Sequence, residues 1–133
     1  MSRSTLAAVA AAGALGALAR HLLGGWLTAL LPGPFPAATL IINLLGTLLL
    51  GFVTGYGIER GRLPEAWRVP VSVGFLGSFT TFSTWAVDTV LLFEAGHRTP
   101  AVANVALSLA LGPVAAWAGR TAGVRYRPAQ PGR

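Results

Sequence analysis

The sequence contains no cysteine and no lysine, and it is poor in charge. The absence of cysteine excludes disulfide bonds and thiolate chemistry. All ten basic residues are arginines, so the chain has no phosphate-binding loop that ends in lysine, and ATP hydrolysis by this chain alone is excluded. Only 11% of the residues are charged, 53% are hydrophobic, and the mean hydropathy is +0.63. A soluble domain needs a more strongly charged surface, so the composition indicates a membrane protein.

Patterns typical of enzymes and of nucleic-acid-binding proteins are also missing. The two histidines, His21 and His97, have no serine, cysteine or carboxylate near them at the spacing of a catalytic triad or a metal site. No basic patch interleaved with aromatic residues lies outside the apolar runs. We therefore expect neither an enzyme nor a nucleic-acid-binding protein.

Four apolar runs are long enough to cross a bilayer, which takes roughly 20 residues. They cover about residues 5–31, 37–58, 69–93 and 100–119. Residues 1–19 also have features of a signal peptide, but three further runs follow and the first run resumes at Gly24, so a full first helix is the better interpretation. The sequence predicts one all-α membrane domain over residues 1–133, with four transmembrane helices and a basic tail at 120–133.

The third run holds an unusual stretch at residues 74–85, GFLGSFTTFSTW, with two glycines, five hydroxyl groups and four aromatic rings. Gly74 and Gly77 weaken a helix, so we expect the third helix to break there. A break at membrane depth frees main-chain carbonyl groups, which then need a partner such as an ion. Phe79, Phe82 and Trp85 follow at intervals of three and are expected to share one face of the helix that resumes.

Polar groups recur at intervals of four in the other runs. The second run has Asn43, Thr47, Gly51 and Gly55, and the fourth has Asn104, Ser108 and Gly112. Small residues on one helix face allow close helix packing. Asn43 could join two helices or offer its amide donors to an anion, and Ser108 could bond its own helix or line a path.

Arg20 is the one basic residue inside the first run. A charge within a span is costly and normally faces protein or water. Arg20 could extend its side chain to the membrane surface, cap a neighbouring helix, or attract anions at a vestibule. The sequence leaves these alternatives open.

Amide, hydroxyl and aromatic groups without a lysine or a deeply placed carboxylate suit a small anion better than a cation or a proton. Hydroxyl and amide groups donate hydrogen bonds, and the positive edge of a ring such as Phe82 can contact an anion. Such a site could replace the water around a strongly hydrated anion and still release the anion. Ordinary packing is the alternative interpretation of the aromatic residues.

Three motifs resemble those of the Fluc (CrcB) family of bacterial fluoride channels, in the same order along the chain. They are GALGALAR at residues 13–20, NLLGTLLLG at 43–51 and GFLGSFTTFST at 74–84, the last of which contains the TTFST signature of the family. The resemblance covers nearly the whole chain.

The resemblance implies passive fluoride export through an antiparallel dimer of four-helix subunits. It implies a structural sodium ion at the centre, held by the main-chain carbonyls of Gly77 and Thr80. It also implies a fluoride path lined by Asn43, Phe82, Ser83, Trp85 and Ser108. Two positions depart from the family pattern, because Trp85 replaces a second phenylalanine and Gly112 stands where a hydroxyl residue is common.

Two other functions are compatible with four short spans. A proton-coupled multidrug-type exporter normally carries its proton on a carboxylate within the first span, and this first span has none. A membrane scaffold without transport would use its polar groups for packing and would free no carbonyl groups.

The arginines are distributed unevenly along the chain. With four spans, one side of the membrane receives the N-terminus, residues 59–68 and the tail, and carries Arg3, Arg60, Arg62, Arg68, Arg120, Arg125, Arg127 and Arg133. The other side carries Arg98 alone. The positive-inside rule then predicts both termini in the cytoplasm. A subunit fixed in this orientation would need an oppositely oriented homologue to form an antiparallel dimer, whereas one that inserts both ways could pair with itself.

Overall fold

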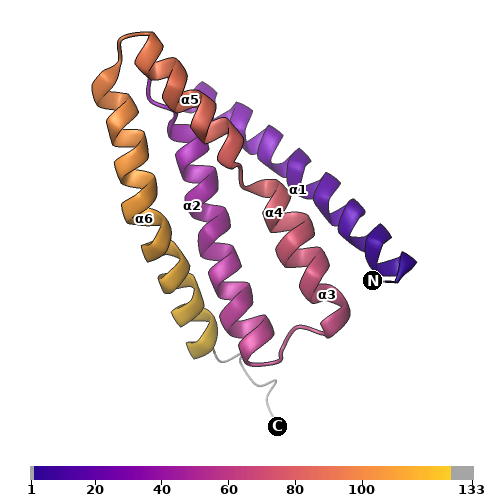
Figure 1. The fold of residues 1–133 in the computed structure, drawn as a ribbon. Helices are drawn as coiled ribbons and strands as arrows, with labels where there is room; N and C mark the ends of the chain where they lie inside the picture. Colours follow the sequence, from indigo (N-terminus) through magenta and orange to yellow (C-terminus); the bar gives the residue numbers. More distant parts are fainter. Residues whose placement is uncertain (1, 127–133) are drawn as a thin grey trace.

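The computed structural model describes residues 2–126, and every regular element in this range is helical. The elements are α1 (Arg3–Leu30), α2 (Ala37–Phe52), η1 (Val53–Glu59), α3 (Glu65–Val69), η2 (Pro70–Leu76), α4 (Gly77–Phe79), α5 (Phe82–Glu94) and α6 (Arg98–Arg125). The segments η1 and η2 are π-helical and directly continue α2 and α3. Figure 1 shows a helical bundle in which α2 and α6 run side by side and α1 lies along the divided third segment.

Three helices are long and apolar enough to cross a membrane: α1, the continuous helix of α2 and η1, and α6. The expected third span, residues 69–93, is divided into two helical parts, and its first part begins earlier than expected, at Glu65. The prediction of an all-helical fold with a broken third span is confirmed.

The break lies at a different place from the one expected. Gly74 and Gly77 are both helical, and the residues with extended backbone are Thr80 and Thr81. Gly74 is needed for packing, because a Cβ there would lie 2.8 Å from the carbonyl oxygen of Val9 in α1. A glycine that weakens an isolated helix therefore serves here to bring two helices together.

This position of the break separates the aromatic residues that we expected on one face. Phe79 ends α4 and is 5% exposed, whereas Phe82 begins α5 and is 77% exposed. Phe79 packs in the core with Leu27 and Ile42. The expected shared face is therefore wrong for Phe79 and holds only for Phe82 and Trp85.

The basic tail expected at 120–133 is also wrong in its first part. Helix α6 continues to Arg125, and Arg120 forms a two-point ion pair with Glu59, with N–O distances of 2.6 and 2.9 Å. Arg60 donates to the carbonyl of Val124 at the end of α6, at 3.1 Å. These contacts join the end of η1 to the end of α6. Residues 127–133 lie outside the described part of the chain.

Glycines bring α6 against the continuous helix of α2 and η1. A Cβ on Gly119 would overlap the carbonyl group of Leu48, and one on Gly51 would overlap that of Ala116. A Cβ on Gly55 would meet α6 in the same way. The expected packing face in the second span is thus confirmed for its two glycines. The polar residues at the other end of that face, Asn43 and Thr47, belong to the candidate functional site.

Candidate functional site

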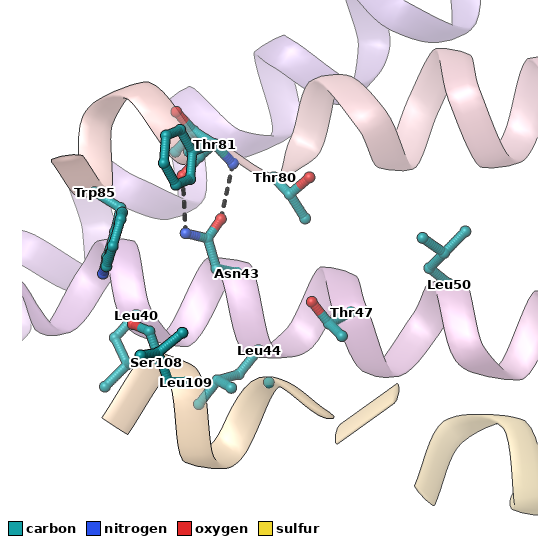
Figure 2. Close-up of a pocket in the computed structure, with 12 residues that line it drawn as sticks. Leu40, Asn43, Leu44, Thr47, Leu50, Thr80, Thr81, Trp85, Ser108 and Leu109 are labelled. Carbon is teal, nitrogen blue, oxygen red and sulfur yellow. Dashed lines mark hydrogen bonds between the residues drawn. The ribbon is translucent and has the colours of Figure 1, made fainter. Parts of the chain in front are cut away.

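The side chain of Asn43 holds the break in the third span. Its Oδ1 accepts a hydrogen bond from the main-chain N–H of Thr81 at 2.8 Å, and its Nδ2 donates to the carbonyl of Thr81 at 2.9 Å (Figure 2). A carboxamide has the same donor and acceptor as a peptide group, so Asn43 supplies both bonds that the extended residue cannot make within a helix. Of the two roles considered for Asn43, joining helices is confirmed.

The break leaves two carbonyl groups without their usual partners. In a continuous helix the N–H of Thr81 would bond the carbonyl of Gly77, but here it bonds Asn43. The N–H of Thr84 would bond the carbonyl of Thr80, but here it bonds the hydroxyl of Thr81. Gly77 is exposed, so its carbonyl lies near the surface of the single chain.

The hydroxyl groups of the TTFST motif largely bond one another and the nearby main chain. The Oγ1 of Thr81 accepts from the N–H of Thr84 at 3.1 Å and so caps α5. It also bonds the hydroxyl of Thr84 at 2.9 Å and lies 3.3 Å from that of Ser83. Thr80 donates its hydroxyl back to Leu76 at 3.1 Å. The motif thus ends one helix and begins the next.

A groove of about 320 Å³ lies between α2, the break, the start of α5 and the middle of α6. It brings together Asn43, Phe82, Trp85 and Ser108, four of the five residues expected on the fluoride path. Ser83 is exposed on the first turn of α5 and does not line the groove. Four leucines, three threonines and Gly112 complete the walls, so the groove is mainly apolar with a few polar groups.

Two lining positions reflect the departures from the family pattern. The ring centroids of Phe82 and Trp85 are 5.1 Å apart, and the indole N–H of Trp85 donates to the carbonyl of Asn104 at 3.4 Å. Gly112 also lines the groove, and a Cβ added there would meet no atom within 4 Å. The place of the usual hydroxyl side chain is therefore open.

The structure separates Asn104 and Ser108, which the sequence placed in one row at intervals of four along the fourth span. Ser108 lines the groove, but Asn104 is fully buried between α5 and α6 and does not line it. The sequence could not separate the two residues, because both belong to the same row at intervals of four. Sequence analysis also missed the hydrogen bond that the hydroxyl of Thr39 donates to Asp88, at 2.8 Å.

Arg20 lies in a second cavity, of about 350 Å³, between α1, α2 and the start of α5. This cavity also holds His21, Thr39 and Thr84. Thr81 lines both this cavity and the groove, so the residue that Asn43 binds lies between the two spaces. Gly77 and Thr80, expected to bind a metal ion, do not line the Arg20 cavity.

Side-chain metal ligands are not grouped in the described part of the chain. Among residues 2–126, no set of three or more His, Asp, Glu or Cys side chains is close enough to hold a metal ion. The oxygen atoms at the break are the main-chain carbonyls of Gly77 and Thr80, which lack their usual helical partners, and threonine and serine hydroxyls that bond one another or the main chain. A hard cation such as sodium binds oxygen ligands, so these carbonyls are the chemically suitable donors.

A family model described as CrcB-like protein, Camphor Resistance (CrcB), matches residues 7–120. The chain belongs to the CrcB family. The resemblance seen in three short motifs is thus confirmed over most of the sequence. With three long apolar helices and a divided third span, this CrcB chain is a multi-pass membrane protein.

Several curated relatives cover nearly the same length as this CrcB chain. It is 70% identical to fluoride-specific ion channel FluC 2 of Symbiobacterium thermophilum, over 92% of this chain and 99% of the relative. It is 44% identical to fluoride-specific ion channel FluC 1 of the same organism, over 86% and 94%. It is 38% identical to fluoride-specific ion channel FluC of Geobacter metallireducens, over 86% and 93%.

Replacing Asn43 should destabilise this CrcB chain. Asn43→Leu keeps the volume but leaves the N–H and the carbonyl of Thr81 without partners, at a cost of roughly 1–3 kcal/mol for each group. Thermal unfolding of the purified protein in detergent should show a lower midpoint. Thr47→Val, one turn further along α2 on the same face, is the matched control and should change the midpoint little. Equal midpoints for the Asn43 and Thr47 variants would show that the hydrogen bonds between Asn43 and Thr81 do not stabilise the fold.

Proposed function

We propose that this chain forms a fluoride channel that lets fluoride leave the cell passively across the cell membrane and so lowers cytoplasmic fluoride. The observation that carries the proposal is the match to curated fluoride-specific ion channels over 86% or more of the chain, at up to 70% identity. The lining of the groove supports it, since the few polar groups among its apolar walls include an amide and hydroxyls. The activity proposed is transport without a chemical reaction.

The fluoride path that we propose follows the groove. The Nδ2 of Asn43 has two protons, and one of them is used by the carbonyl of Thr81. Its second proton, the hydroxyl of Ser108 and the ring edges of Phe82 and Trp85 are then the groups that contact the anion. Ser83, on the exposed first turn of α5, would contact the anion outside the groove.

Arg20 would act before the anion reaches this path. It lies in the cavity on the other side of Thr81, where a guanidinium group raises the local concentration of anions. Arg20 is partly buried and has no carboxylate partner within the described residues. The proposed role is therefore a vestibule for fluoride.

We also propose a structural sodium ion bound by the carbonyls of Gly77 and Thr80. Both carbonyls lie at the break, and the N–H groups that would bond them in a continuous helix bond side chains instead. In lipid such groups need a partner, and a cation bound by several carbonyl oxygens provides one. When bound, sodium would neutralise the carbonyl dipoles and hold the break in place. One chain offers too few of these oxygens, so a second subunit would contribute the others.

An antiparallel dimer is the assembly that we propose. Phe82 is 77% exposed although it lines the groove, so a single chain leaves the proposed path open on one side. A second subunit related by a two-fold axis in the membrane plane would close the groove and complete the carbonyl set. The partner is either a second copy of this chain or a homologue inserted in the opposite orientation.

The charge distribution favours the homologue. Figure 1 places both ends of the described chain at the end of the bundle that also carries residues 59–68. Six described arginines belong to this end, against Arg98 near the other, so we propose that both termini face the cytoplasm. Symbiobacterium thermophilum has two numbered relatives, FluC 1 and FluC 2, which supports the idea that two related subunits can occur together. The departures at Trp85 and Gly112 fit a pair in which the partner keeps the usual pore residues.

Fluoride flux tests the function directly. Liposomes that contain the chain, alone or with a co-expressed homologue, should release fluoride and retain chloride when a membrane potential is applied, which supplies about 2.3 kcal/mol per charge per 100 mV. Ser108→Ala should lower the release several-fold, because it removes a donor from the groove. Ser72→Ala, which removes a hydroxyl bonded to the carbonyl of Arg68 outside the groove, is the matched control. Release that requires a proton gradient would support a proton-coupled exporter instead.

Sodium removal tests the cation site. Exchange of sodium for N-methylglucamine should lower both the fluoride flux and the fraction of dimer on size exclusion. Thr80→Val should keep the response to sodium because the ligand is a main-chain oxygen, whereas Gly77→Leu should weaken the response by crowding the carbonyl set. If flux and dimer fraction were the same without sodium, the site would be refuted.

Membrane orientation can be measured with reporters fused to the C-terminus. We expect activity from a reporter that works in the cytoplasm and almost none from one that works outside it. Comparable signals from both reporters would show dual insertion and would support a homodimer.

A further inference from the structure

A closed chain of hydrogen bonds links α5 to α6 beside the groove. The Nδ2 of Asn104 donates to the hydroxyl oxygen of Thr89 at 2.9 Å. The hydroxyl of Thr89 donates to the main-chain carbonyl of Trp85 at 2.8 Å. The indole N–H of Trp85 returns to the main-chain carbonyl of Asn104 at 3.4 Å. Trp85 is therefore held at both its main chain and its side chain.

The bonds fix the orientation of the Asn104 amide. A hydroxyl group has one proton, and that of Thr89 is directed at Trp85, so Asn104 must present its donor to Thr89. Its Oδ1 is then buried without a hydrogen-bond partner within the described residues. An unpaired buried acceptor is unfavourable, and a leucine of similar volume would avoid it. Packing alone thus gives no reason for an asparagine at this fully buried position.

Trp85 needs this support more than a phenylalanine would. Its indole N–H is a donor that phenylalanine lacks, and the helical carbonyl of Asn104 has a second lone pair that accepts it. With the N–H directed at α6, the ring stays in the groove wall beside Phe82, 5.1 Å away between centroids.

We propose that Asn104 and Thr89 are positioning residues that hold the indole of Trp85 in the wall of the anion path. The inference rests on the proposed fluoride channel. Neither residue lines the groove, and the indole N–H bonds the main chain of residue 104. The two side chains therefore act by holding α6 against α5, which keeps that carbonyl directed at the indole. The tryptophan at position 85 and the buried asparagine at position 104 then form one functional unit on the two helices.

The first test is fluoride flux from liposomes, normalised to the amount of folded dimer. Asn104→Leu and Thr89→Val should each lower flux roughly three- to tenfold, the factor that corresponds to the net contribution of one hydrogen bond. Thr54→Val is the matched control for Thr89→Val, because Thr54 also bonds the carbonyl four residues earlier, at 2.8 Å, and makes no bond to another helix among residues 2–126. It should leave flux unchanged.

A double-mutant comparison separates positioning from a purely structural role. In the Trp85→Phe background there is no indole N–H to direct, so Asn104→Leu should change flux less than about twofold there. An equal loss in both backgrounds would overturn the proposal. Should Asn104→Leu fail to fold, the same comparison with Thr89→Val decides the question.

Tryptophan fluorescence gives a readout that does not depend on transport. Trp26, Trp67 and Trp117 are all exposed, so their replacement by phenylalanine leaves Trp85 as the single reporter. In this protein, Asn104→Leu and Thr89→Val should shift the emission of Trp85 and raise its quenching by acrylamide, whereas Thr54→Val should not. An unchanged Trp85 signal in both variants would overturn the inference, whereas absence of fluoride flux from the unaltered chain would refute the proposed channel and leave this measurement valid.

Discussion

The pairing of one extended residue, Thr81, with the side chain of Asn43 is the contact on which the rest of the site depends. In a membrane a main-chain group without a partner is costly, so a helix can break only where another group replaces the lost bonds. Asn43 replaces two of them, at 2.8 and 2.9 Å. The break can then persist, and it provides both a capped start for α5 and two carbonyls, those of Gly77 and Thr80, without their usual helical partners.

Glycines place the helices so that this contact can form. Gly16 lies against the carbonyl of Phe75, and Gly74 lies against that of Val9, so α1 and η2 approach main chain to main chain. Gly51 and Gly119 do the same for α2 and α6. Close approach on both sides leaves no room for side chains in the tightest contacts. The groove and the Arg20 cavity meet instead at Thr81 in the break, which lines both of them.

Most polar groups near the break are already engaged in structure. The hydroxyls of Thr80, Thr81 and Thr84 bond the main chain or one another, and Asn104 bonds Thr89. Few donors remain in the groove, with Ser108 and the second amide proton of Asn43 among them. A path with few donors and aromatic edges can take a hydrated anion without holding it too strongly. The small number of free hydrogen-bond donors in the groove thus favours conduction over tight binding of the anion.

The sequence by itself determined the membrane class, the helical fold, the presence of a break in the third span and the family, because composition, run length and motif order are local properties. The family resemblance also placed Asn43, Phe82, Ser83, Trp85 and Ser108 on one path, and all of these except Ser83 line the groove. Only the tertiary structure decided that the break lies at Thr80 and Thr81, because a glycine weakens a helix and permits packing equally well, and only its neighbours show which role it has. The same holds for Asn104, since residues at equal spacing on one helix are distinguished only by what the next helix places against them.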